Sequence, residues 1–238
     1  MSPWLRVLGL FAAAVLAALV LKLLPPLVVL ALLVGGVAYA NHVLITKPKR
    51  QAARRAAEAL GLRPVPDAEA GLVGLPFALL TRPGAVASQV MAGPWRGREI
   101  RVFDLELPRP EAFTGASRFT CALVPLPFAA PRLVVEPAAF LTPPEERPGL
   151  PVCDVPSERV ATRFDVRCED PAFAASFLGE PVADWLVGEQ ERLGLELAGS
   201  AALLYRSWVP AKERDLVLDA VSGFLAAVPA GRSSEGAG

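Results

Sequence analysis

Two long apolar runs open the chain. Leu5 to Leu24 is twenty residues with two charges, Arg6 at its start and Lys22 near its end, and Leu27 to Ile45 is nineteen residues with none if His42 is neutral. Twenty helical residues span about 30 Å, the thickness of the hydrocarbon core of a bilayer, so each run is long enough to cross it. One helix through both runs would be about twice that length, and Pro25-Pro26 favours a turn between them. The pattern therefore predicts a transmembrane hairpin rather than one kinked, tilted helix.

Positive charges set the expected orientation of this hairpin. Five Lys or Arg residues between positions 47 and 55 follow the second run, Arg6 lies at the start of the first, and the turn offers only Lys22. Because Lys and Arg concentrate in cytoplasmic loops, we expect a multi-pass protein of the cell membrane with both termini cytoplasmic. A cleaved signal peptide is the alternative, but the second apolar run and the lack of a clear A-x-A site argue against it. Small residues in both runs allow helices to pack closely, either within the hairpin or between two copies of the chain in a homodimer.

The rest of the chain predicts a soluble α+β domain with a mainly antiparallel sheet. The hairpin covers residues 1–46, a basic collar helix and linker 47–70, the domain 71–228 and a disordered tail 229–238. Two hairpins are expected in the domain, one through Gly93–Gly97 and one about Gly199-Ser200. The predicted strands are Val86–Ala92, Arg98–Leu107, Ser117–Val124, Leu133–Glu136, Ala161–Glu169, Leu193–Leu197 and Ala202–Val209.

The clearest strand and the helices lie in the second half of the domain. Apolar and polar residues alternate along Ala161–Glu169, which is typical of a strand with one buried face. Asp170-Pro171 then has the form of a helix N-cap and first helical residue. A second short helix begins at Glu180-Pro181, and Lys212–Val228 has the apolar spacing of an amphipathic helix.

Charge divides the chain in the same way as hydropathy does. The formal net charge is zero, but residues 1–63 hold eight Lys or Arg and one acid, which gives +7, and the remainder holds sixteen and twenty-three, which gives −7. We interpret the basic collar helix Arg50–Leu60 as ordinary positive-inside charge rather than as recognition of one particular lipid. An acidic domain lacks the positive surface that nucleic acid requires. The expected partners are the lipid bilayer and a membrane protein or a second copy of the chain, with no nucleic acid.

The number and spacing of the cysteines indicate on which side of the membrane the domain lies. Cys121, Cys153 and Cys168 are an odd number with no C-x-x-C spacing, and a cytoplasmic domain would keep them reduced, so we expect three free thiols. Alternation with Phe119 and Phe164 places Cys121 and Cys168 inside the sheet, where they would be inert. If the domain lay outside the cytoplasm, one disulfide and one free thiol would be the alternative.

The sequence lacks the motifs of common catalytic sites. The only histidine, His42, lies in the second apolar run, so His-based triads and zinc sites are excluded from the domain, and the usual phosphate loops and nucleophile elbow are absent. Paired acids can act as acid and base or bind a hard cation, but here a strand end, a Pro-rich loop and a helix cap explain them. These acids are Asp104 with Glu106, Glu145-Glu146 and Glu169-Asp170. We therefore predict no catalytic residue, cofactor or metal.

Three short motifs lie in the domain: Gly74-Leu-Pro-Phe77, the stretch from Gly93 to Asp104 with Trp95, Gly97 and Arg98, and the stretch from Phe164 to Pro171. Together they resemble an uncharacterised bacterial family, mainly actinobacterial. The resemblance spans about Met1 to Val228 and implies two membrane helices followed by a cytoplasmic α+β domain. It carries no activity and no site.

These observations favour a membrane-tethered, noncatalytic interaction or scaffolding module on the cytoplasmic face. The alternative is a membrane-associated enzyme with a carboxylate-based site that acts on a lipid or peptide. A cleft that brings Asp104, Asp165 and Glu169 together would favour the enzyme, whereas a filled sheet with the acids on separate faces would favour the module.

Overall fold

The computed structural model describes residues 57–66, 69–108, 116–138, 149–189 and 193–228, together with Gly36 and Arg55. The predicted transmembrane hairpin, most of the collar helix, Glu145-Glu146 and the tail lie outside these residues. Within the described residues, no helix combines the length and the apolar character that crossing a membrane requires. The chain divides into two compact units, Met1–Gln51 and Ala52–Gly238, and the second contains the fold that follows.

Within these ranges, six strands form one antiparallel sheet, which confirms the mainly antiparallel α+β domain. The order is β1-β2-β3-β4-β5, and β6 also pairs with β4. The strands are β1 (Arg63–Pro64), β2 (Val86–Trp95), β3 (Arg98–Pro108), β4 (Ala116–Pro137), β5 (Phe164–Cys168) and β6 (Leu193–Ser207).

The β2–β3 hairpin confirms the first predicted hairpin but has a tighter turn. Pairing continues to Trp95 opposite Arg98, so only Arg96 and Gly97 form the turn, with φ values of 46° and 80°. Two successive residues with positive φ are typical of the two-residue turns that match the twist of paired strands. Trp95 packs against the core and its indole Nε1 donates a hydrogen bond to Ser222 Oγ at 3.1 Å, as expected for a structural aromatic residue.

Strands β4 and β6 correct two sequence predictions. β4 is a single strand of 22 residues instead of two strands separated by a Pro-rich connection, and β6 is a single strand of 15 residues instead of a hairpin about Gly199. The register between them shifts on both sides of Ala130, which lies opposite Gly199 with a φ of +57°. Proline and positive-φ glycine are tolerated where the hydrogen-bond ladder between two strands is interrupted. The prolines of β4 and Gly199 of β6 therefore mark an irregularity that the two long strands share, and they do not form turns.

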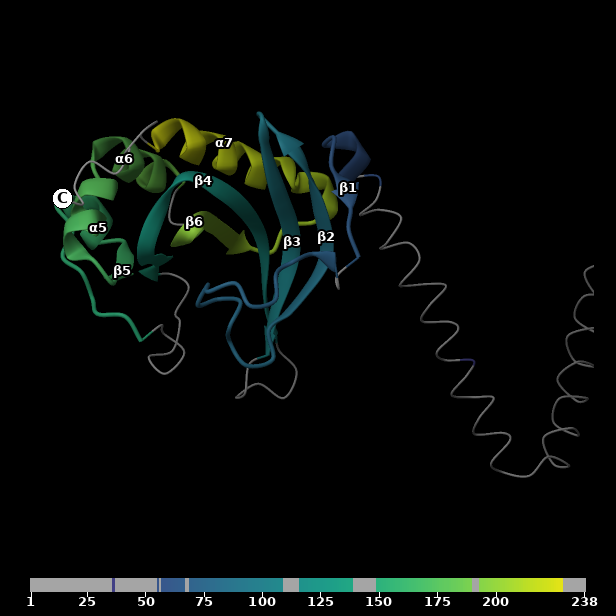
Figure 1. Ribbon diagram of the computed structural model, residues 1–238, viewed down its shortest axis with the longest axis horizontal. Helices are drawn as coiled ribbons and strands as arrows, with labels where there is room; N and C mark the ends of the chain where they lie inside the picture. Colours follow the sequence, from purple (N-terminus) through teal and green to yellow (C-terminus); the bar gives the residue numbers. More distant parts are fainter. Residues whose placement is uncertain are drawn as a thin grey trace, which may run out of the picture. The chain divides into compact units, whose positions relative to one another are not determined.

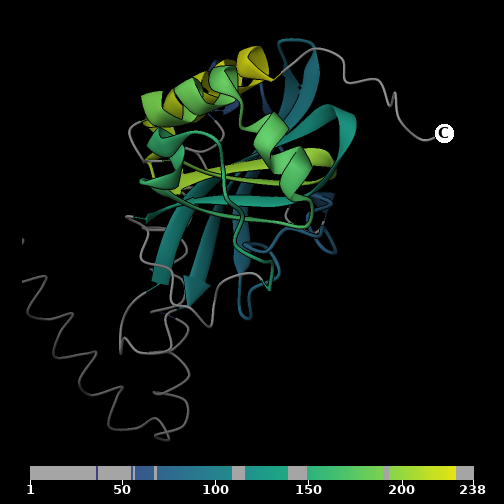
Figure 2. The same cartoon turned by 90° about the vertical axis from the view of Figure 1, so that its left-hand side faces the viewer.

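The helices cover one face of this sheet. Figure 1 shows α7 lying across β4, β3 and β2, and Figure 2 shows the helices gathered on the same side of the strands. The Asp170 carboxylate accepts hydrogen bonds from the N–H groups of Ala172 and Phe173 at 2.9 and 3.0 Å, which confirms the predicted cap. The helices are α4 (Glu158–Ala161), α5 (Pro171–Phe177), α6 (Glu180–Gly188), the 3-10 turn η5 (Ala211–Glu213) and α7 (Asp215–Ala227).

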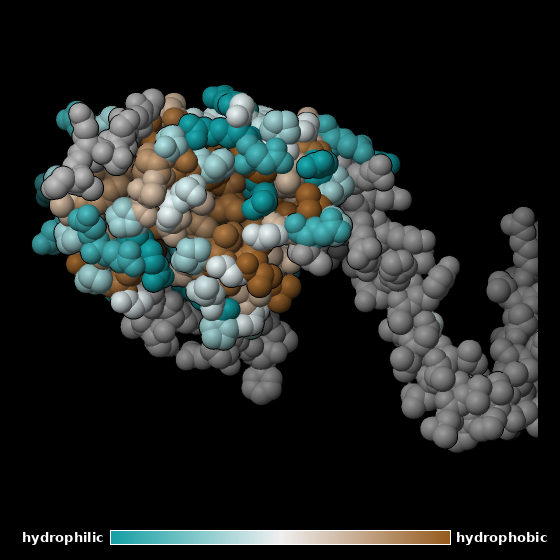
Figure 3. Space-filling view, in the orientation of Figure 1, coloured by the Kyte–Doolittle hydropathy of each residue, from teal (hydrophilic) through white to brown (hydrophobic). Residues whose placement is uncertain are grey.

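The two faces of the sheet have separate apolar cores within the described residues. The larger core lies under the helices and includes Ala57 and Leu62, so residues that we assigned to the collar and linker contribute to the domain. The smaller core lies on the opposite face and is covered by the segment 70–85, which inserts Phe77 and Leu79. In the space-filling view, apolar surface gathers over the region that this segment occupies in Figure 1 (Figure 3).

The cysteines contradict the prediction of three free thiols. Cys153 and Cys168 form a disulfide and Cys121 is free, which is the arrangement stated above as the alternative for a domain outside the cytoplasm. The prediction that Cys121 and Cys168 are buried is confirmed, and burial raises the pKa of the Cys121 thiol well above its ordinary value, with the Asp104 and Glu196 charges acting in the same direction. The bond was missed because the two residues are 15 positions apart, and only the return of the chain along β5 brings them together.

Candidate interaction site

The acids that would have indicated an enzyme do not converge. Asp104 is on β3 and is buried on the helix-covered face, whereas Asp165 alternates with the core residues of β5 and points to the other side. Asp165 forms an ion pair with Arg167 at 3.1 Å, and Glu169 accepts the backbone N–H of Arg132 at 3.0 Å. This is the arrangement that we expected of an interaction module.

Asp104 is the centre of a buried polar network. Its Oδ1 pairs with Arg214 Nη2 at 3.0 Å and accepts the Thr120 hydroxyl at 3.3 Å, and its Oδ2 accepts the Trp208 indole N–H at 3.1 Å. Both charged side chains of the pair are only 1% exposed. A buried carboxylate needs such partners because an unpaired charge in a dry interior is costly. Asp104 thus has a structural role.

Arg214, the residue that directly precedes α7, supplies the positive charge of this network. Its guanidinium also donates to the side-chain and backbone oxygens of Gln89, at 3.2 and 3.5 Å, and lies 3.4 Å from Met91 Sδ. Gln89 has a φ of 54° where the register between β2 and β3 shifts, so the irregularity in β2 presents these oxygens. Burial lowers the pKa of Arg214, and the Asp104 carboxylate acts in the opposite direction. Arg214 was not among the residues predicted from the sequence, although a positive residue at a helix N-terminus is unfavourable to the helix dipole and so indicates another role.

Next to this network on the same face of the sheet, four residues form a partly exposed row across neighbouring strands. Val86 lies opposite Glu106, Glu106 lies opposite Arg118, and the Arg118 carbonyl accepts the backbone N–H of Trp208 at 3.0 Å. Cross-strand neighbours share a face, and positions two residues apart on a strand share it too, so this row and Asp104 lie on the same face. We call these four residues the Trp208 row.

The Trp208 row combines an aromatic ring, a cation and an apolar side chain. The Arg118 guanidinium carbon lies 4.5 Å from the centre of the indole ring, and Arg118 Nε pairs with Glu106 at 2.8 Å. Trp208 is 40% exposed and Val86 is 57% exposed. The hydrogen bond to buried Asp104 fixes the indole before anything binds, which reduces the entropy lost on association. Trp and Arg are the residues that most often dominate protein interfaces, so this arrangement suits binding.

Glu196 on β6 is a second buried acid with a structural role. Its carboxylate accepts the backbone N–H groups of Ala78 and Leu79, at 2.6 and 3.0 Å, and so fastens the segment 70–85 to the sheet. Burial raises the pKa of Glu196 to about 7, while these hydrogen bonds and the Arg82 charge lower it and Glu136 raises it.

A small cavity lies beside the disulfide, away from the Trp208 row. Its volume is about 300 Å³, and it is lined by residues of α4, β5 and the segment before α4, among them Cys153, Asp154, Phe164 and Asp165. In the part of the chain that the structure describes, no group of three or more His, Cys, Asp or Glu side chains could hold a metal ion.

Comparison with known proteins supports the fold. No family model matches the chain, and no curated protein matches it. Among solved structures, the chain is similar to the crystal structure of the mycobacterial trehalose monomycolate transport factor A, TtfA, with a TM-score of 0.55 and 13% sequence identity. The similarity covers 77% of this chain and 98% of that one. The likeness establishes a shared fold with a protein of the bacterial group to which the family resemblance pointed.

Proposed function

We propose that this chain is a membrane-tethered, noncatalytic interaction module on the cytoplasmic face, and that it binds an integral membrane protein through the Trp208 row. The row carries this proposal because its ring is fixed by a buried network while its outer surface remains available. Tethering raises the effective concentration of a partner in the same membrane, so a compact contact of this kind is sufficient.

The similarity to TtfA suggests the process that the module serves. That protein is named as a trehalose monomycolate transport factor. Because the similarity covers 98% of that chain, we include an accessory role in lipid transport in this proposal, although a fold alone does not determine function. The enzyme alternative has no comparable support, since Asp104, Asp165 and Glu169 point in different directions and each has its own partner.

Site-specific photo-crosslinking in the native membrane tests this proposal. A photoreactive residue at Val86 should give one discrete product with an integral membrane protein, and Arg118→Ala should abolish that product. Val73 is the matched control position, because it is 98% exposed and belongs to the segment that covers the opposite face. Equal products from both positions, or a Val86 product that Arg118→Ala leaves unchanged, would contradict the proposal. A product with a second copy of the chain would replace the membrane-protein partner with a homodimer.

A further inference from the structure

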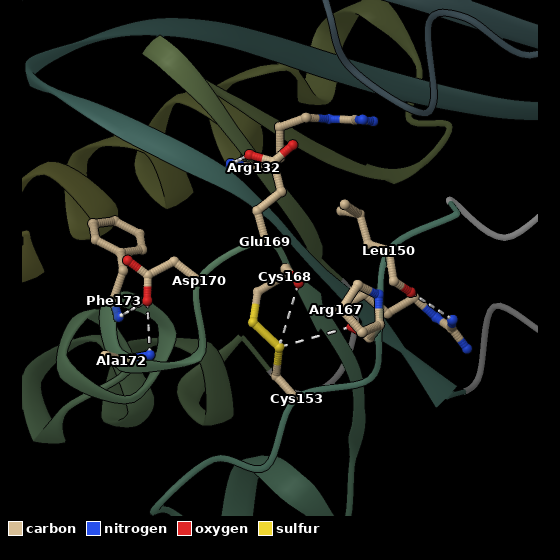
Figure 4. The surroundings of a disulfide bond; sticks show 10 residues. Arg132, Leu150, Cys153, Arg167, Cys168, Glu169, Asp170, Ala172 and Phe173 are labelled. Carbon is tan, nitrogen blue, oxygen red and sulfur yellow. Dashed lines mark hydrogen bonds between the residues drawn. A yellow bond between two sulfur atoms is a disulfide. The ribbon is translucent and has the colours of Figure 1, made fainter.

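The disulfide fastens a short segment to the outer edge of the sheet (Figure 4). Val152 pairs with Arg167 of β5 through two backbone hydrogen bonds, from Cys153 N–H to Val166 O at 2.9 Å and from Cys168 N–H to Pro151 O at 3.1 Å. β4 occupies the opposite side of β5, and among the described residues the segment Leu150–Cys153 is what covers the other edge. We call Leu150–Cys153 the edge segment.

Among the residues that the structure describes, few other contacts hold the edge segment in place. Pro151 is exposed and Val152 is 65% exposed, so only Leu150 and Cys153 bury their side chains. The Arg167 guanidinium adds one hydrogen bond to the Leu150 carbonyl, at 3.1 Å. By comparison, β5 is paired with β4 along its whole length. A segment with little buried surface opens locally at low cost, so the covalent bond is its principal attachment.

The two sulfur atoms differ in their accessibility. Cys153 lines the cavity of about 300 Å³, whereas Cys168 is fully buried. An incoming reagent therefore reaches Cys153 first. The remaining thiol, Cys121, belongs to the core on the other face of the sheet, and its raised pKa disfavours the thiolate that exchange requires. The exchange chemistry is thus confined to the Cys153–Cys168 pair.

We propose that Cys153 and Cys168 form a redox latch, which holds the edge segment on β5 when oxidised and releases it when reduced. This inference rests on the cytoplasmic placement in the proposed function, because cytosolic disulfides are usually transient or redox-sensing, whereas exported ones are structural. Release uncovers the N–H of Cys168 and the carbonyl of Val166, and an open strand edge is a site where a partner can add a strand.

Both directions of the latch use ordinary thiol chemistry. For closure, the Cys153 thiolate attacks a peroxide and becomes a sulfenic acid with loss of hydroxide; the Cys168 thiol then displaces water and the disulfide forms. For opening, a cellular dithiol attacks Cys153, Cys168 leaves as a thiolate and takes up a proton, and the second thiol of the reductant releases Cys153 as its own disulfide forms. Each direction transfers two electrons.

Hydrogen exchange of the full-length chain in detergent micelles tests the release. Treatment with dithiothreitol should speed exchange at the amides of Cys153 and Cys168 at least tenfold and leave the β4–β6 amides unchanged. In the double variant Cys153→Ser/Cys168→Ser, the amides at positions 153 and 168 should exchange rapidly without reductant. The control variant Cys121→Ser keeps both latch cysteines and should exchange as the wild type does. Unchanged exchange at these two amides, or faster exchange throughout the sheet, would overturn the latch.

Thiol trapping in living cells tests whether the latch operates. Acid quenching and alkylation should find the Cys153–Cys168 pair mostly reduced in unstressed cells, oxidised after peroxide, and reduced again on recovery. A pair that stays in one state throughout would overturn the latch. A reporter fused after Val228 distinguishes this failure from failure of the placement: an exported reporter contradicts the cytoplasmic proposal, whereas a cytoplasmic reporter with a permanently oxidised pair contradicts only the latch.

Discussion

The buried pair of Asp104 and Arg214 should dominate the stability of this end of the sheet. Removing one partner of a buried ion pair typically costs about 3–5 kcal/mol because the other charge stays buried without compensation. Arg214→Met leaves the carboxylate with two donors, from Thr120 and Trp208, so we expect about 3 kcal/mol. Asp104→Asn leaves the guanidinium with neutral acceptors only, so we expect about 5 kcal/mol.

Urea unfolding of the full-length chain in micelles, followed by tryptophan fluorescence, measures these losses. The double variant Asp104→Asn/Arg214→Met should lose less than the sum of the single variants, because no charge is then left unpaired. Arg159→Met is the control, since its pair with Asp184 is more than 60% exposed on both sides and should cost less than about 1 kcal/mol. If each single variant lost as little stability as the control, or if the losses of the two single variants added up in the double variant, Asp104 and Arg214 would not be a strongly coupled buried pair.

Three further predictions concern the rest of the domain. The pKa of Glu196 is about 7 in the folded protein against an ordinary 4.5, so its protonation stabilises the fold fully below pH 4.5 and this stabilisation is lost as the pH rises through 7. The free energy of unfolding, measured from pH 4 to 8, should therefore fall by up to about 3 kcal/mol, and Glu196→Gln should flatten that fall. Gly194→Ala would place its Cβ in the Tyr205 ring and should lower the unfolding free energy by about 1–3 kcal/mol in urea titrations. The fragment that begins at Ala52 should melt cooperatively, whereas one that begins after Ala57 should melt at a lower temperature because it lacks a core residue.

Local patterns predicted the elements whose determinants are local. The alternation along β5 and the Asp170 cap both depend on residues within a few positions, and both are confirmed. The same rules failed for β4 and β6, because Pro125 and Gly199 are ordinarily signals of a break. Only the pairing of two long strands with a matching irregularity keeps each strand continuous.

The candidate site depends on contacts between distant residues, which local patterns do not encode. Trp208 and Asp104 are 104 positions apart, and Arg214 reaches Gln89 across 125. Cys153 meets Cys168 only because the edge segment returns along β5. The sequence attributed Asp104 to the end of a strand, whereas it lies within β3, and its buried partners come from distant parts of the chain.

An affinity measurement is the sharpest test of whether the Trp208 row binds a membrane partner. The full-length chain in nanodiscs would be titrated with the membrane protein captured at Val86. Arg118→Ala should weaken binding at least tenfold, a loss of about 1.4 kcal/mol, as expected of an interface hot spot, while Val73→Ala should leave Kd unchanged. A Kd for Arg118→Ala within about twofold of the wild type would contradict the account.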